Sequence, residues 1–263
     1  MRANKSRRQR KRDGNSRGKR SAHGVPLPPI LKLVLLPGMD GTGELFADFV
    51  HALPETLPTV TVRYPTDRFL SYTELAGLVH ESCPVSEPFV LVAESFSSPL
   101  AIQYAAANPE NLAALILCAG FASSPVHGWR RLLASLCAPI VFRISLPQFL
   151  AEYALVGPDA PASLLKAVQA AISSVKPSVL AARLREVIDC EVLAELNRVA
   201  APILYIHAED DRLAGASCLE EIRRIKPQVA VATIEGPHLL LQREPHQTAA
   251  VISEFLRRLD LIR

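Results

Sequence analysis

The sequence is poor in cysteine, and its cysteines are arranged like neither a disulfide framework nor a zinc site. Five are scattered over 263 residues, with no two in C-x-x-C spacing: Cys83, Cys118, Cys137, Cys190 and Cys218. Disulfide-stapled domains carry an even number of cysteines, and structural zinc sites need closely spaced ones. We therefore expect reduced, mostly buried thiols and no bound metal.

Long apolar runs are also missing. No stretch has enough consecutive apolar residues to span a bilayer. The basic segment at the start of the chain is followed by Ser21-Ala-His-Gly-Val-Pro-Leu-Pro-Pro, which is not the apolar region of a secretory signal. Together with the cysteine pattern, these absences predict a cytoplasmic protein.

Acidic residues are almost absent from residues 1–20. This stretch holds ten of the 29 basic residues and one of the 26 acidic ones, so the remaining 243 residues carry 19 basic against 25 acidic side chains. Its lack of apolar side chains predicts a disordered tail that continues through the Pro-rich linker to residue 29. Such a tail can contact nucleic acid or an anionic membrane, or can serve only as a solubilising extension.

The rest of the chain has ample apolar material for one large core, since 49% of all residues are hydrophobic. Short apolar runs alternate with helical patterns, which predicts an α/β domain over residues 30–263 with a mostly parallel central sheet of about six strands flanked by helices. The expected strands are 31–36, 60–64, 89–93, 112–118, 202–208 and 229–234. The expected helices are 71–82, 96–107, 217–225 and a last one that runs to the C-terminus.

The alternation pauses between about residues 122 and 200, where only helical periodicity is found. One apolar face contains Leu164, Leu165, Val168, Ile172 and Val175, and another contains Leu180, Leu184, Val187 and Ile188. This region is predicted to be a helical cap inserted after the fourth strand. Its apolar segment 129–142 either lines an acyl pocket or merely covers the core.

The apolar run at 89–93 ends abruptly in Glu94-Ser95-Phe96-Ser97. A strand, a sharp turn and a helix start would place Ser95 at the tip of the turn, with the small residues Ala93 and Ser97 two positions to either side. This is the arrangement of a nucleophile elbow. A serine that only caps a helix is the alternative.

Polar residues follow other predicted strands at their carboxyl ends, where open parallel sheets bind ligands. Residues 37–43 form a glycine-rich loop without the Lys-Ser/Thr ending of a phosphate loop. Asp210 and Asp211 follow the fifth strand, and His238 follows the sixth. A serine hydroxyl becomes a good nucleophile when an imidazole takes its proton and a carboxylate holds that imidazole.

At these positions the chain resembles the α/β-hydrolase superfamily. The likeness rests on LVLLPGMDGTG, LVAESFS, ILYIHAEDDRL and IEGPHLLLQREP, in that order. The resemblance implies that Ser95 is the nucleophile, His238 the base and Asp211 the orienting acid, with no cofactor. It also implies that the backbone N–H groups of Met39 and Phe96 form an oxyanion hole.

The sequence departs from the common family pattern in three places. Pro37 stands where a histidine is usual, Ala93 and Ser97 stand where the elbow usually has glycines, and no clear hairpin precedes residue 31.

Neighbouring residues offer alternatives to these assignments. Asp210 competes with Asp211, although the acid usually comes three residues after a small residue, here Ala208. We expect His207 to be a structural histidine with satisfied hydrogen bonds, and Glu94 to point away from Ser95 and form supporting hydrogen bonds. Asp40 either tunes the polarity of the glycine-rich loop or stabilises its own turn, and the second role is the more common one.

The predicted function is a serine hydrolase that cleaves a small-molecule carboxylic ester or thioester through an acyl-Ser95 intermediate. Loops such as PGMDGTG also resemble those of plastid esterase and acyltransferase relatives, so acyl transfer to an alcohol is one alternative. The other is a non-catalytic binding protein of the same fold that uses its basic arm, residues 1–20.

Overall fold

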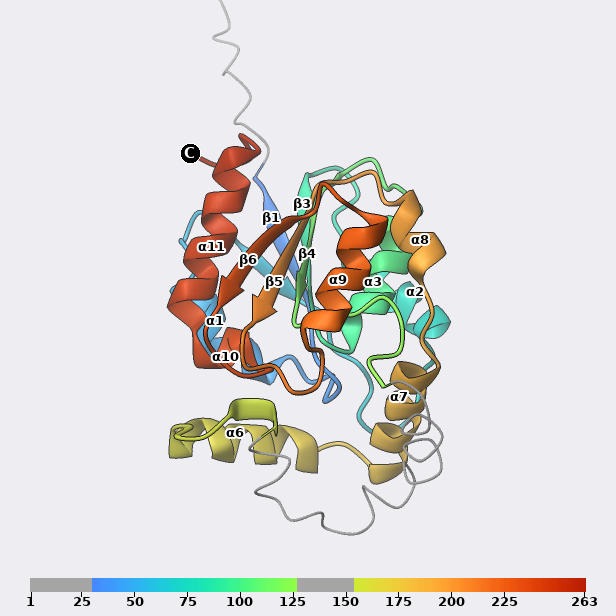
Figure 1. Cartoon of the computed structure of the whole chain (residues 1–263), viewed down its shortest axis with the longest axis vertical. Coiled ribbons are helices and arrows are strands. Elements are labelled where there is room, and N and C mark those ends of the chain that lie inside the picture. The colour runs from blue at the N-terminus through green and yellow to red at the C-terminus, as the bar shows by residue number, and fades with distance from the viewer. Residues whose placement is uncertain (1–29, 127–153) are drawn as a thin grey trace, which may run out of the picture.

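The computed structural model describes residues 30–126 and 154–263. They form a six-stranded sheet in the order β2-β1-β3-β4-β5-β6, and every neighbouring pair is parallel (Figure 1). This confirms the predicted α/β architecture. The strands are β1 Lys32–Leu36, β2 Thr59–Thr61, β3 Phe89–Glu94, β4 Leu112–Cys118, β5 Ile203–Ala208 and β6 Ala230–Ile234.

Helices cover both faces of the sheet and its carboxyl end (Figure 1). One face carries the short η1 Glu44–Phe46, α1 Ala47–Ala52, α10 Leu240–Arg243 and α11 Pro245–Arg258. The other carries α2 Tyr72–Ser82, α3 Ser97–Ala105, α8 Leu193–Arg198 and α9 Ala216–Ile225. Beyond the carboxyl ends of the strands lie α6 Ala162–Ser173 and α7 Pro177–Asp189.

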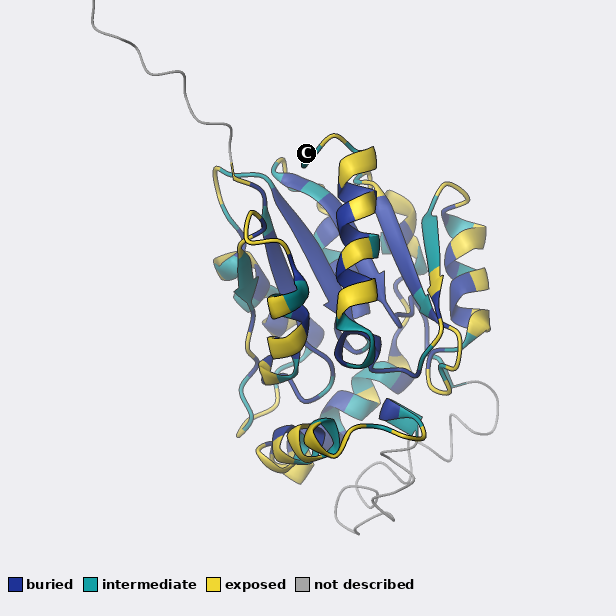
Figure 2. Ribbon diagram, turned by 90° about the vertical axis from the view of Figure 1, so that its left-hand side faces the viewer, coloured by how far each residue is buried: buried dark blue, intermediate teal, exposed yellow. Residues whose placement is uncertain are grey.

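The central strands are apolar on both faces because each face is covered by helices. All six residues of β3 are buried. Val90 and Val92 belong to the core cluster under α1 and α11, whereas Phe89, Leu91 and Ala93 belong to the cluster under α2, α3 and α9. Figure 2 shows the resulting buried sheet between helices whose outer faces are exposed.

Two helical features differ from the sequence-based expectation. The helix α1 was not predicted, because it spans only six residues and buries one of them, Phe49, against α11, so it has no long amphipathic face. The expected single last helix is two helices, α10 and α11. Pro245 begins α11, and because proline has no N–H to donate, the preceding helix ends there.

The second strand ends earlier than predicted. The chain leaves the sheet after Thr61, and the Tyr64 N–H instead donates to the Gly41 carbonyl at 2.8 Å. After the hydrogen bond from the Val62 N–H to the Leu35 carbonyl of β1, at 2.9 Å, the backbone turns away from β1 toward the glycine-rich loop.

The segment between β4 and β5 contains α6, α7 and α8, as the helical periodicity predicts. Its two ends meet, because Ser123 bridges to Glu191 and the Val192 N–H donates to the Ala122 carbonyl at 2.7 Å. The last of its helices, α8, packs on α3 and α9 and so belongs to the body of the sheet. Three predicted features lie outside the described residues: the basic tail and linker 1–29, the apolar segment 129–142, and Cys137.

The four cysteines within the described ranges are buried free thiols, as expected: Cys83, Cys118, Cys190 and Cys218. No helix in residues 30–126 or 154–263 is long and apolar enough to cross a membrane.

Candidate active site

Ser95 lies at the tip of the turn between β3 and α3, as the elbow pattern predicts. Its φ of 48° is in the left-handed region, which L-residues other than glycine, asparagine and aspartate seldom adopt. Such strain is typical of functional turns. Ala93 and Ser97 are fully buried beside the turn, so only small side chains fit there.

The unusual serine of the elbow forms a bridge to the glycine-rich loop. The Ser97 hydroxyl donates to the Pro37 carbonyl, and the Tyr64 hydroxyl donates to Ser97 Oγ at 2.7 Å. Burial raises the pKa of Tyr64 well above its usual value, so its hydroxyl stays protonated. A glycine at position 97 would lack both hydrogen bonds.

The glycine-rich loop runs beside the elbow because β1 and β3 are in register, with Leu36 paired to Ala93. Within the loop Gly41 and Gly43 have φ of 72° and 71°, which favours glycine. Met39 and Phe96 line the same cavity as Ser95. Among the described residues, neither of their N–H groups donates to a backbone carbonyl.

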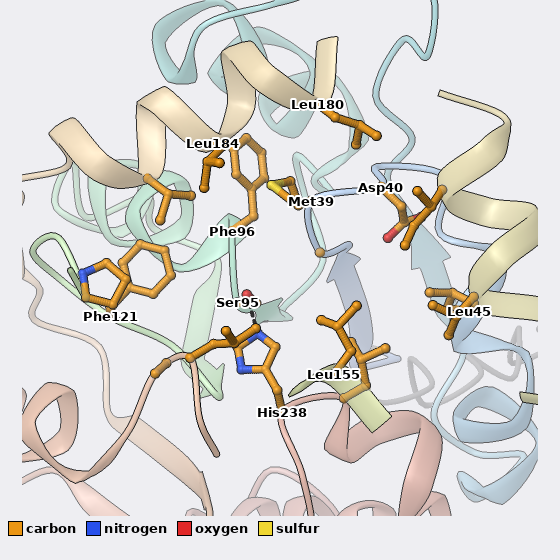
Figure 3. A pocket seen from close by; sticks show the side chains of 18 of the residues that line it. Met39, Asp40, Leu45, Ser95, Phe96, Phe121, Leu155, Leu180, Leu184 and His238 are labelled. Atoms are coloured by element: carbon orange, nitrogen blue, oxygen red, sulfur yellow. Dashed lines mark hydrogen bonds between the residues drawn. The ribbon is translucent and has the colours of Figure 1, made fainter. Parts of the chain in front are cut away.

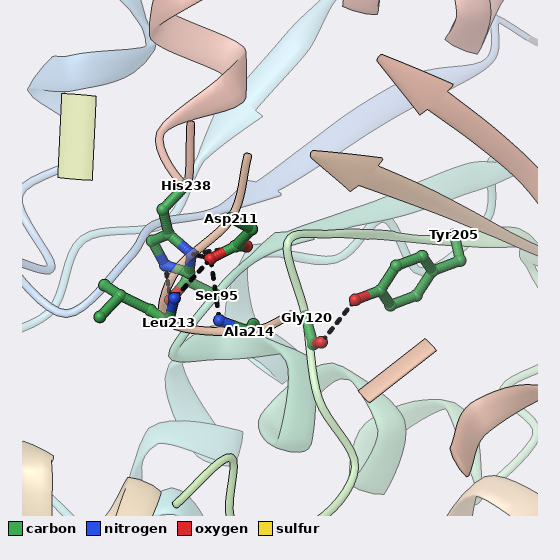
Figure 4. Close-up of polar contacts among 7 residues, drawn as sticks. All are labelled: Ser95, Gly120, Tyr205, Asp211, Leu213, Ala214 and His238. Carbon is green, nitrogen blue, oxygen red and sulfur yellow. Dashed lines mark hydrogen bonds and ion pairs between the residues drawn. The ribbon is translucent and has the colours of Figure 1, made fainter. Parts of the chain in front are cut away.

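His238 and Asp211 follow β6 and β5, and they come together with Ser95 (Figure 4). His238 Nε2 lies 2.7 Å from Ser95 Oγ, and His238 Nδ1 lies 2.8 Å from Asp211 Oδ2. The side chains of His238 and Asp211 are buried. Because a carboxylate only accepts, Nδ1 must carry a proton, and Nε2 is then free to accept the Ser95 hydroxyl proton.

Asp211 is held as a carboxylate by the groups around it. Burial alone would raise its pKa, but hydrogen bonds from His238, Ala214 and Leu213 outweigh that effect and hold the pKa below its usual value. The Leu213 and Ala214 N–H groups each donate to Oδ1 at 2.8 Å. The carboxylate is therefore fixed in position and charged near neutral pH.

Three polar residues near the proposed catalytic residues have other surroundings: Asp210, Asp40 and His207. Asp210 is exposed, and its backbone N–H donates to the Gly236 carbonyl at 3.0 Å. Asp40 accepts from the Thr42 N–H at 2.9 Å, which confirms its turn-stabilising role. The expectation for His207 was wrong in one respect: its Nδ1 is buried and has no hydrogen-bond partner among the described residues.

Glu94, the last residue of β3, is buried beside the site and forms a hydrogen bond with α10. Its Oε2 accepts from Gln242 Nε2 of α10 at 3.3 Å. Burial and the nearby charge of Asp40 raise the pKa of Glu94 to about 7, against the lowering effects of Gln242, His238 and the Gly38 N–H. Glu94 thus links the end of β3 to α10 and to Gly38 of the glycine-rich loop.

A cavity of about 200 Å³ opens from Ser95 toward α6 and α7 (Figure 3). Apart from Ser95, His238 and Asp40, its described lining residues are apolar or glycine. They include Met39, Leu45, Phe96, Phe121, Leu155, Val168, Ile172, Leu180, Leu184 and Val187. An uncharged, lipophilic group suits these walls.

No protein-family model matches the chain. A search of curated proteins finds no significant match either. Solved structures do match over most of their length. A thermophilic esterase from Thermogutta terrifontis has a TM-score of 0.72 and 21% identity, over 88% of this chain and 91% of that one. The enol-lactonase from Burkholderia xenovorans LB400 has a TM-score of 0.74 and 14% identity, over 90% and 94%.

A lipase-esterase related protein from Clostridium acetobutylicum has a TM-score of 0.71 and 15% identity, over 86% of this chain and 95% of that one. The chain has the α/β-hydrolase fold. This fold explains why residues from β3, β5 and β6 converge at one edge of the sheet, since all their carboxyl ends lie there.

One residue at the site of this α/β-hydrolase fold was missed in the sequence. Arg183 of α7 is 1% exposed, and its guanidinium contacts the glycine-rich loop. The available signal was its spacing: Arg183 lies three residues after Leu180 and four before Val187, within an otherwise apolar face.

A metal site is not formed by the described part of the chain. Within it, no three His, Cys, Asp or Glu side chains are grouped so that they could hold an ion.

Proposed function

We propose that the protein is a serine hydrolase that cleaves a carboxylic ester or thioester through an acyl-Ser95 intermediate. The observation that carries this proposal is the chain of hydrogen bonds from Ser95 through His238 to Asp211 at the end of an apolar cavity. The esterase and lactonase folds that the chain resembles support it as analogy only.

In the first half of the reaction, Ser95 Oγ attacks the carbonyl carbon and its proton passes to His238 Nε2. Asp211 stabilises the imidazolium that results. The carbonyl oxygen becomes an oxyanion, and in our proposal it is bound by the N–H groups of Met39 and Phe96. Collapse breaks the ester bond, and the leaving alcohol or thiol takes the proton from His238.

In the second half, a water molecule loses a proton to His238 and attacks the acyl-Ser95 carbonyl. Collapse breaks the bond to Ser95 Oγ, which recovers its proton from His238, and the carboxylic acid leaves. Acyl transfer would use the same steps with an alcohol in place of water.

The walls of the cavity set the proposed substrate class. The described lining holds no Lys or Arg that could bind a charged acyl group, whereas leucine, isoleucine and valine side chains from α6 and α7 form much of it. We therefore propose an uncharged aliphatic or aromatic acyl group.

A fluorophosphonate probe tests the proposal without knowledge of the natural substrate. We expect the probe to label Ser95, located by mass spectrometry of the labelled peptide, and the protein to hydrolyse p-nitrophenyl esters. Ser95→Ala should lose both properties. Ser98→Ala is a matched control, since Ser98 lies three residues later in the first turn of α3 and its buried Oγ has no hydrogen-bond partner among the described residues.

Two results would count against the proposal. One is a folded wild-type protein that the probe does not label. The other is a Ser95→Ala variant that hydrolyses esters as fast as the wild type. Either would favour a non-catalytic binding protein with this fold.

A further inference from the structure

Arg183 is the largest fully buried side chain in the described part of the chain. It lies in the middle of α7, and no carboxylate of the described residues forms an ion pair with it. Burial lowers the pKa of its guanidinium, and the more distant charge of Asp40 offsets this in part. A buried charge without an ionic partner is costly, so its position calls for an explanation.

The guanidinium is held by backbone carbonyls instead. Nη1 donates to the Met39 and Asp40 carbonyls, each at 2.8 Å, and Nη2 donates to the Pro65 carbonyl at 2.9 Å. Two of these three acceptors belong to the glycine-rich loop. The planar fork of arginine can reach all three, which a lysine ammonium cannot do with the same geometry.

The guanidinium also lies against aromatic rings at the elbow. Its central carbon is 5.9 Å from the centre of the Phe96 ring and 5.7 Å from that of the Tyr64 ring. One side chain therefore contacts both residues whose N–H groups are the proposed oxyanion donors: Met39 through its carbonyl and Phe96 through its ring.

From this geometry we infer that Arg183 is a positioning residue for the oxyanion hole. Its hydrogen bond to the Met39 carbonyl fixes the peptide that follows the Met39 N–H, and its contact with Phe96 fixes the other donor residue from the same side. Catalysis by such donors requires that they be in place before charge develops on the substrate oxygen. The inference rests on the proposed function.

The same helix also forms a wall of the cavity. In Figure 3 the side chains of Leu180 and Leu184 extend from α7 toward the side that Met39 and Phe96 line. Arg183 therefore ties the helix that would contact the acyl group to the loop that would bind its carbonyl oxygen.

Arg183→Met and Arg183→Lys test this role by steady-state kinetics and thermal melts. Removing a whole oxyanion donor costs about 10²–10³-fold in kcat, so misplacing one should cost about 10- to 100-fold. We expect that loss in kcat for Arg183→Met, with KM within about threefold of wild type because Arg183 itself does not line the cavity and the side chains of α7 that do are unchanged. The kcat of Arg183→Lys should lie between that of the wild type and that of Arg183→Met. Arg185→Met is the matched control, since Arg185 is exposed on the same helix, and it should leave both constants unchanged.

The outcomes separate this inference from the proposed function. A folded Arg183→Met variant with kcat within threefold of wild type would overturn the inference, and so would a loss seen only in KM. Should Arg183→Met not fold, Arg183→Lys decides, because a wild-type kcat in that variant contradicts the need for the guanidinium fork. Ser95 labelling in the wild type shows that the proposed function holds whichever way the Arg183 variants behave. An unlabelled wild type overturns the proposed function, and the inference with it.

Discussion

The hydroxyl of Ser97 donates a hydrogen bond to the carbonyl oxygen of Pro37, a residue 60 positions earlier in the chain. The bond joins the two segments that must be fixed relative to each other if Ser95 and an oxyanion hole are to act together. It also accounts for one departure from the common family pattern, since a serine at 97 supplies a donor that glycine lacks; the acceptor is a backbone carbonyl, which any residue at position 37 would supply.

Ser97→Ala should lower the free energy of unfolding by about 1–3 kcal/mol, since it leaves the Tyr64 hydroxyl and the Pro37 carbonyl buried without this partner. Urea denaturation measures the effect. Tyr64→Phe added to Ser97→Ala should cost less than the sum of the single changes, because it removes an unsatisfied group. Additive costs would show that the two hydroxyls do not interact.

Asp211→Asn should leave folding intact and reduce kcat roughly 10⁴-fold, because an amide no longer holds His238 in the tautomer that accepts the serine proton. Asp210→Asn is the neighbouring control and should change kcat little, since Asp210 is exposed. Ester hydrolysis and thermal melts of both variants, measured side by side, give the answer. If Asp210→Asn were inactive and Asp211→Asn active, Asp210 and not Asp211 would be the residue that orients His238.

Glu94→Gln should change how stability depends on pH. Burial raises the pKa of Glu94 from 4.5 to about 7, so the folded protein keeps a proton that the unfolded chain releases between these values. This contribution is fully present below pH 4.5 and is lost as the pH rises to about 7, a change of about 3 kcal/mol. Relative to wild type, Glu94→Gln should therefore gain stability toward pH 8.

Urea titrations at several pH values between about 4 and 8 measure that slope for the wild type and the variant. Glu220→Gln, at an exposed position, serves as the control and should keep the wild-type slope. Identical slopes for Glu94→Gln and wild type would mean that the pKa of Glu94 is the same in the folded and the unfolded protein, which contradicts the prediction.

Leu184→Trp should shorten the acyl chains that the protein accepts. Leu184 lines the cavity, and a larger side chain there takes up part of a volume of about 200 Å³. We expect kcat/KM for octanoyl esters to fall at least tenfold more than for acetyl esters. Arg185→Trp, on the exposed side of α7, should preserve the wild-type profile. An equal loss for all chain lengths would place the acyl group elsewhere.

The sequence was most informative where a strand ends in a polar residue. Ser95, Asp211 and His238 could be selected because each lies within four residues of the end of an apolar run, and parallel strands bring such ends to one edge. Met39 and Phe96 were named through the resemblance to α/β-hydrolases, and both line the cavity beside Ser95. These patterns are local in the sequence, so they can be recognised without knowledge of how distant segments pack.

Contacts between distant segments could not be read in the same way. Arg183 was missed because a charged residue inside an apolar helical face has no meaning until its partners are known, and they are carbonyls more than 100 residues away. The burial of His207 Nδ1 without a hydrogen-bond partner among the described residues also depends on packing between distant segments, so the sequence did not reveal it. Pro245 did carry a local signal for the break between α10 and α11, and it was overlooked.

Gly41 gives the Arg183 contact a consequence for protein engineering. A Cβ on Gly41 would stand 2.7 Å from Arg183 Nη1 and 2.9 Å from Tyr64 Cβ, at a φ that already disfavours a side chain. The space for the guanidinium is thus supplied by the loop, while the guanidinium itself comes from α7. A chimaera that exchanges α7 with that of another protein of this fold must therefore keep positions 41 and 183 as a matched pair. Arg183 beneath a loop with a side chain at position 41 would clash, and Gly41 above a smaller residue at position 183 would leave an empty space.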